Sequence, residues 1–172
     1  PIKRSERGTE LPLLSFAQQR LWFLAQLEPN SSSYNLPAAV RLQGELNHNA
    51  LEQSFNEIVR RHEALRTNFQ TREGQVVAVI SKDLFLTLPI FDLSELPANQ
   101  QQVEIKQQAS QEVQKPFDLS NDHLIRLKLF RLGEQEHILL LTMHHIVSDT
   151  WSIGVLIEEL VALYAAFCAG KP

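Results

Sequence analysis

Helix-like and hairpin-like patterns interleave along this chain of 172 residues. Ser15 and Gln18 form a capping-box pattern ahead of an apolar face that Pro29 ends, which predicts a first helix. Further helices are predicted at 49–62, 96–114 and 152–169, and strands at 38–42, 65–70, 75–80, 84–90, 124–132 and 136–144. This order lacks the strict alternation of strands and helices in a doubly wound parallel fold. We therefore predict one α/β domain with a mixed sheet and flanking helices.

Charge and cysteine content restrict the partners. The formal net charge is −4 at pH 7, whereas a protein that holds nucleic acid by its phosphates normally carries a clustered basic excess. Cys168 is the only cysteine, which excludes an intrachain disulfide and a cysteine-based zinc site. We identify no run of 18 apolar residues and no signal-peptide core near the start. We therefore expect a cytoplasmic protein with neither a nucleic-acid nor a membrane partner.

The two ends of the chain are typical of a fragment. It begins at Pro1 rather than Met, and Gly170 and Pro172 form a helix-end signal at its close. Tag removal or processing would leave the same trace. We expect residues 1–10 to be a leader or linker and the whole to be a piece of a longer polypeptide.

The segment MHHIVSDTWS, residues 143–152, contains the most informative candidates for catalytic residues. A predicted strand delivers His144 and His145 to its end, and neighbouring side chains on a strand point to opposite faces. One imidazole is therefore expected to be buried and hydrogen-bonded while the other faces a cleft. A metal site needs at least three convergent ligands, which opposite-facing histidines beside Asp149 make awkward. A serine hydrolase using Ser148 or Ser152 is disfavoured because the chain has no G-x-S-x-G turn.

Two more segments complete a recognisable set. SFAQQRLWFL alone is typical of a capped, core-facing helix, and RHEALRTNF of a cation-rich helix end that suits the helix dipole. Together with MHHIVSDTWS they resemble, in order and spacing, the first three core motifs of condensation domains from nonribosomal peptide synthetases. PFDLSNDHLIRLKLFRL, residues 116–132, also resembles the family's stretch before the hairpin. The resemblance covers the chain from Leu11 onward.

The resemblance implies a fold and an activity. Members have a chloramphenicol-acetyltransferase-like fold with two lobes around a tunnel, and residues 11–172 resemble the N-terminal lobe, without the C-terminal lobe. The amine of an acceptor attacks the thioester carbonyl of a donor to form a peptide bond. Both substrates are carried on the phosphopantetheine of partner carrier-protein domains, and an adjacent adenylation domain is expected in the parent. The lobe itself would bind no cofactor, and alone we expect it to be inactive.

The same resemblance assigns roles to individual residues. His145 matches the second histidine of the motif and is the expected catalytic residue, as a base, as a group that orients the amine, or as a stabiliser of the tetrahedral intermediate. His144 and Asp149 match structural positions, and Arg66 is expected to form an ion pair with Asp149 that fixes the turn. The expected tunnel-lining residues are Thr150, Trp151 and Ser152.

One departure from the family pattern keeps alternatives open. Thr150 stands where the family usually has glycine, so any backbone freedom used there is in doubt, and its branched side chain would narrow the tunnel beside His145. A non-catalytic docking module that binds carrier proteins is one alternative. A coenzyme A-dependent acyltransferase of the same superfamily is another. The heterocyclising branch has aspartates in place of the histidine pair and does not fit.

Overall fold

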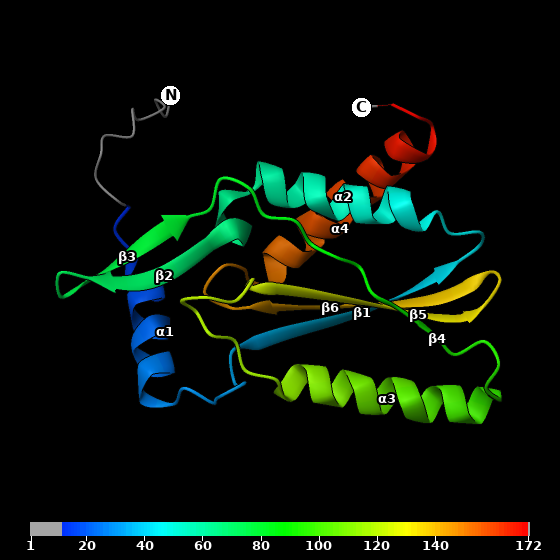
Figure 1. The fold of residues 1–172 in the computed structure, drawn as a ribbon, viewed down its shortest axis with the longest axis horizontal. Helices are drawn as coiled ribbons and strands as arrows, with labels where there is room; N and C mark the ends of the chain where they lie inside the picture. The colour runs from blue at the N-terminus through cyan, green and yellow to red at the C-terminus, as the bar shows by residue number, and fades with distance from the viewer. Residues whose placement is uncertain (1–11, 172) are drawn as a thin grey trace.

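The computed structural model describes residues 12–171, so the expected leader at 1–10 lies outside the described residues (Figure 1). The elements, in chain order, are α1 (Phe16–Leu27), β1 (Asn35–Gln43), α2 (His48–Arg61), the 3-10 helix η1 (Glu63–Arg66), β2 (Thr67–Arg72), β3 (Gln75–Ile80), β4 (Ile90–Asp92), α3 (Ala98–Gln114), β5 (Ile125–Gly133), β6 (Glu136–His144) and α4 (Thr150–Cys168). The predicted α/β class is confirmed.

The main sheet is mixed, as predicted. Its strand order is β1-β6-β5-β4, with β6 antiparallel to both β1 and β5, and with β4 parallel to β5. Strands β2 and β3 form a separate antiparallel pair around the turn at Glu73 and Gly74. Both turn residues adopt positive φ, 52° at Glu73 and 79° at Gly74, and Gly74 accepts this conformation at no steric cost. The predicted hairpin at this position is therefore confirmed.

Helices cover both faces of the main sheet. Figure 1 shows α2 and α4 on one face and α3 on the other. Leu139, Leu141 and Met143 of β6 pack with α2 and α4, whereas Leu140 packs toward α3. This alternation is the period-2 geometry of a strand. The alternation places the side chain of His144, the last residue of β6, on the α3 side of the sheet. The next residue, His145, is directed toward the other side.

Helix α1 sits at the end of the sheet where β6 finishes. Its capping box is present as predicted, with the Ser15 Oγ accepting from the Gln18 N–H and the Gln18 side chain accepting from the Ser15 N–H. Trp22 packs on a cluster that contains Phe69 and Phe117, and Ile146 joins that cluster. Residues from three distant parts of the chain therefore meet around the turn that follows β6.

Two strand predictions are wrong. Residues 84–89 form no strand, and only Ile90 of the expected strand enters β4. Leu86 and Leu88 are buried, but Asn56 of α2 takes up both main-chain groups of Leu86, at 2.8 and 3.0 Å. The apolar alternation of this segment therefore reflects packing beneath α2 rather than pairing in a sheet. Leu65 and Arg66 likewise belong to η1, and β2 starts at Thr67.

Helix α4 corrects the statement about apolar runs. It has 19 residues and a mean hydropathy of 1.6, enough by length and composition to cross a membrane. Its buried residues Leu156, Leu160 and Leu163 pack against α2 and the sheet. A single helix of this kind is weak evidence for a membrane span.

Candidate active site

His145 lies in the turn after β6 with its side chain exposed. Its main-chain N–H donates to the Tyr34 oxygen at 2.9 Å, and its Nδ1 lies 2.8 Å from the Ser148 main-chain oxygen. A carbonyl oxygen only accepts hydrogen bonds, so Nδ1 carries the ring proton. When the ring carries a single proton, the lone pair that can accept a second one therefore belongs to Nε2.

His144 is the buried member of the pair, 5% exposed. Its Nδ1 accepts a hydrogen bond from the Ile146 N–H at 3.1 Å, and its ring lies beside those of Tyr34 and Phe117. Burial, reinforced by His145 in its protonated form and by the charge of Arg126, lowers the pKa of His144 to about 4. The residue is neutral near pH 7, and its accepting nitrogen shapes the turn that carries His145. The expected division into one buried and one exposed histidine is what the structure shows.

Asp149 caps helix α4. Its Oδ1 accepts from the Ser152 N–H at 2.7 Å and from the Ser152 Oγ–H at 2.6 Å, and its own N–H donates to Ser152 Oγ. These hydrogen bonds lower the pKa of Asp149 below its usual value. A carboxylate at this position satisfies an unpaired amide of the first turn and suits the helix dipole. Asp149, which lies four residues after His145, therefore sets where α4 begins.

The expected ion pair between Arg66 and Asp149 is wrong. Arg66 instead donates through Nη1 to the Ser81 main-chain oxygen and pairs through Nη2 with Glu63 at 3.3 Å. The reason is local, because Arg66 ends η1 and so faces the chain leaving β3, while Asp149 is occupied as a helix cap. Arg66 thus ties η1 to the end of the β2–β3 pair.

Thr150 occupies the first position of α4 and is exposed. Within residues 12–171, Glu73 is the non-glycine residue with positive φ, so Thr150 has ordinary helical geometry and needs no glycine-like freedom. The doubt about backbone conformation at this position is therefore removed.

Trp151 and Ser152 line a groove of about 220 Å³ between α4, α2 and η1. Trp151 is 82% exposed, and Val147 and Ser148 of the His145 turn form part of the same wall. The remaining lining residues are Ile58, His62, Ala64, Leu65, Met143, Val155 and Leu156. Thr150 is not among them. The structure thus brings two of the three expected tunnel-lining residues to an apolar groove next to the His145 turn.

Two contacts to this turn escaped the sequence analysis. The Gln18 Nε2 donates to the Ile146 oxygen at 3.4 Å, which links α1 to the turn. Tyr34 supplies the main-chain oxygen that holds the His145 N–H. Gln18 stood out only as a capping residue, and a main-chain acceptor leaves no mark in a sequence.

The described part of the chain holds no group of three or more His, Cys, Asp or Glu side chains arranged for a metal ion. His144 and His145 also differ in direction, one buried on the α3 side and one exposed. The chemistry that the site offers is therefore proton transfer and hydrogen bonding by the exposed imidazole of His145, next to an apolar groove. His62 also lines that groove, but its Nε2 lies 2.9 Å from the Glu159 carboxylate.

Comparisons with known proteins agree on one family. The model of the family described as Condensation domain matches residues 9–172. One component of the linear gramicidin synthase of Brevibacillus parabrevis is 48% identical over 99% of this chain, which covers 3% of that protein. Malpinin synthetase from Mortierella alpina is 46% identical over 96% of this chain, which covers 2% of that protein. The chain therefore corresponds to a small part of these synthetases.

Solved structures show the same fold. The starter condensation domain of rhizomide synthetase superposes with a TM-score of 0.88 at 21% identity, over 95% of this chain and 40% of that one. The first condensation domain of the CDA synthetase gives a TM-score of 0.86 at 24% identity, over 96% of this chain and 42% of that one. The chain thus spans about two fifths of the solved chains that it matches.

Proposed function

Because this chain belongs to the condensation domain family, we propose that it is the His145-bearing, N-terminal lobe of a domain that forms peptide bonds in nonribosomal peptide synthesis. The acceptor amine attacks the thioester carbonyl of the donor, and each substrate is held on the phosphopantetheine of a carrier-protein domain. The parent protein supplies these carrier domains, an adenylation domain and the second lobe. The lobe binds no cofactor of its own and works in the cytoplasm.

The geometry of His145 carries this proposal. With the proton of its ring on Nδ1, held by the Ser148 oxygen at 2.8 Å, the exposed Nε2 is the atom that accepts a proton. As the amine nitrogen bonds to the carbonyl carbon, it loses a proton to Nε2. The tetrahedral intermediate then collapses, the carbon–sulfur bond breaks, and the departing thiolate takes that proton from Nε2, which restores the original state of the His145 ring. General acid–base catalysis of this kind contributes roughly 10²–10⁴-fold to a rate.

The groove beside the turn provides the surroundings for a substrate. Trp151 stands 82% exposed at its edge, and the chain spans 40% of a solved condensation domain chain. We propose that the second lobe closes over this side and completes a tunnel. Without that wall neither pantetheine arm is held in place, and positioning supplies much of an enzyme's rate. The isolated chain is therefore expected to be inactive.

The alternatives have less support. The docking-module hypothesis depended on Thr150, and that residue has regular helical geometry at the start of α4. No described contact favours coenzyme A over a carrier-bound thioester. Peptide-bond formation remains the function that the exposed imidazole supports best.

The test is a condensation assay of the synthetase that contains this sequence, with both carrier domains loaded. Dipeptidyl thioester should form, and the His145→Ala variant should form it roughly 10²–10⁴-fold more slowly with little change in melting temperature. His123→Ala is a matched control, because His123 is another exposed histidine, does not line the groove and has no part in the proposed proton transfer. A His145→Ala variant that condenses at the parental rate would refute the proposal.

A further inference from the structure

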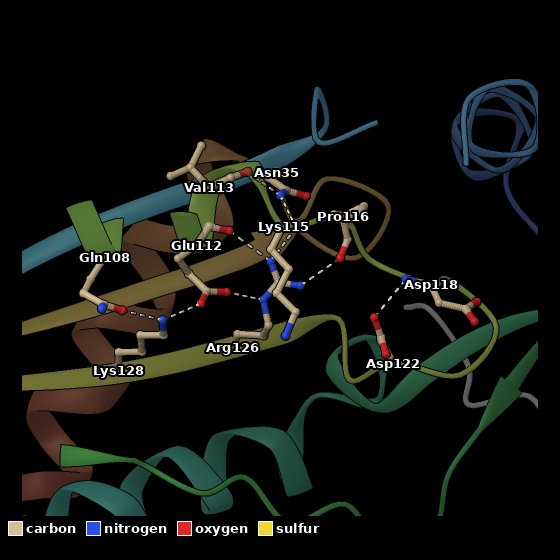
Figure 2. A network of polar contacts seen from close by, with 10 residues as sticks. All are labelled: Asn35, Gln108, Glu112, Val113, Lys115, Pro116, Asp118, Asp122, Arg126 and Lys128. Atoms are coloured by element: carbon tan, nitrogen blue, oxygen red, sulfur yellow. Dashed lines mark hydrogen bonds and ion pairs between the residues drawn. The ribbon is translucent and has the colours of Figure 1, made fainter. Parts of the chain in front are cut away.

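A side chain of β1 holds the C-terminal end of α3 (Figure 2). The Asn35 Nδ2 donates to the main-chain oxygens of Val113 at 2.7 Å and of Lys115 at 2.9 Å. Carbonyls in the last turn of a helix have no partner within the helix, so these two bonds satisfy groups that would otherwise be unpaired. Asn35 is 8% exposed, and its Oδ1 is buried without a hydrogen-bond partner. Its side chain therefore contributes only as a donor.

A second side chain holds the same helix end from β5. Arg126 donates to the main-chain oxygens of Glu112, Lys115 and Pro116 and pairs with the Glu112 carboxylate (Figure 2). Lys128 also pairs with that carboxylate, at 3.1 Å. The end of α3 is therefore fixed rigidly to the sheet, and Asn35 connects it to β1 in particular.

Asn35 lies next to the histidine pair. In the register of β1 and β6, Asn35 is directly opposite His144, and the preceding residue, Tyr34, accepts the hydrogen bond from the His145 N–H. Residues directly opposite in an antiparallel pair project from the same face. The side chain of Asn35 thus reaches α3, while the main chain one residue earlier holds the main chain of His145.

We propose that Asn35 is a positioning residue for His145. Its two bonds to α3 set the position of the first residues of β1, and Tyr34 transmits that position to His145. The ring of His145 is oriented by Ser148, but the point from which the ring projects is set by the Tyr34 oxygen. The effect on catalysis rests on the proposed function, whereas the effect on the position of His145 does not.

Asn68 offers a matched control. It is also an asparagine whose Nδ2 donates to two main-chain oxygens, those of Leu119 at 3.4 Å and of Asp122 at 2.8 Å. It belongs to β2, which is not part of the sheet that contains β1 and β6. A loss of stability alone would be similar for Asn35→Ala and Asn68→Ala. An effect on His145 should arise only from Asn35.

The first measurement uses the full chain of 172 residues labelled with ¹⁵N-histidine. Amide exchange reports the bond from His145 to Tyr34, and the ring nitrogens report the share of the tautomer with the proton on Nδ1. Asn35→Ala should speed exchange of the His145 amide by about 10-fold, the effect of one lost hydrogen bond on a local opening equilibrium, and should mix the tautomers. Asn68→Ala should leave both signals as in the wild type.

The second measurement uses the synthetase that contains this sequence. Asn35→Ala should lower kcat by roughly 10- to 100-fold with KM unchanged, because a small displacement of a reacting group reduces rate rather than substrate binding. Asn35→Ser, which retains one donor on a shorter side chain, should fall between Asn35→Ala and the wild type in both measurements. If Asn35→Ala does not fold, Asn35→Ser replaces it.

Wild-type exchange and tautomer signals of His145 in a folded Asn35 variant would overturn the proposal. Equal changes in the Asn35 and Asn68 variants would overturn it too, because they would indicate general loosening. If His145→Ala keeps the parental rate, the proposed function fails, while the exchange measurement still decides whether Asn35 positions His145.

Discussion

The Nδ1 atom of His145 donates to the main-chain oxygen of Ser148, three residues later, at 2.8 Å. Asp149 follows immediately and caps helix α4. The orientation of the exposed imidazole therefore depends on a turn whose far end is fixed by a helix cap. His144 fixes the near end, because its buried Nδ1 accepts the Ile146 N–H. The variants below separate these contributions.

His144 should contribute mainly to the stability of the fold. His144→Ala removes a buried ring and leaves the Ile146 N–H without its acceptor, so it should lower the free energy of unfolding by roughly 2–4 kcal/mol. His144→Asn offers an oxygen near the position of Nδ1 and should cost less. Urea denaturation of the chain measures both. Equal losses for the two variants would show that the Ile146 hydrogen bond contributes nothing.

The lowered pKa of His144 predicts a pH dependence. Its pKa is about 4 in the folded protein against 6.5 ordinarily, so folding favours the neutral ring. The free energy of unfolding is therefore highest above pH 6.5. It falls by roughly 3 kcal/mol in total as the pH drops from 6.5 toward 4, because the unfolded chain binds a proton at His144 before the folded chain does. Urea denaturation at several pH values should show this loss in the wild type and a shallower one in His144→Asn. Identical slopes would contradict the assignment.

Arg66 and Asp149 should act independently. Asp149→Ala removes the α4 cap and should lower the melting temperature, whereas Asp149→Asn, which also caps helices well, should lower it less. Arg66→Ala should destabilise the chain through its lost bonds to Ser81 and Glu63. A double-mutant cycle should give additive losses. A coupling energy between Arg66→Ala and Asp149→Ala would contradict this prediction, because it would indicate an interaction between the two side chains.

Glu112 should be far more costly to remove than a surface acid. Burial opposes its charge, but the hydrogen bonds and charges of Lys128 and Arg126 outweigh burial and hold the pKa of Glu112 below its usual value. Glu112→Ala leaves two cations uncompensated beside the sheet, at a cost of roughly 3–5 kcal/mol.

The matched control is Glu136→Ala, which removes the exposed pair with Arg41 and should change stability little. Chemical denaturation compares the two. Similar losses in both variants would mean that burial of the Glu112 pair has no consequence for stability.

Local patterns predicted much of the fold. The capping box of Ser15 and Gln18, the apolar stripes of α2 and α4, and both hairpins depend on residues close together in the sequence. The buried and exposed states of His144 and His145 also follow from strand alternation, which acts over one residue. The resemblance in three motifs added the family, which the comparisons confirm.

Sequence by itself determined most of the elements, the buried faces of α2 and α4, and which histidine of the pair is exposed, because helix and strand periods and capping act within a few residues. Only the tertiary structure decided which partners those side chains meet. Arg66 bonds to Ser81 rather than Asp149, Leu86 bonds to Asn56 rather than to a strand, and Asn35 bonds to carbonyls 78 and 80 residues away. A hydrogen bond between distant residues requires the final packing of whole elements, and no local period encodes it.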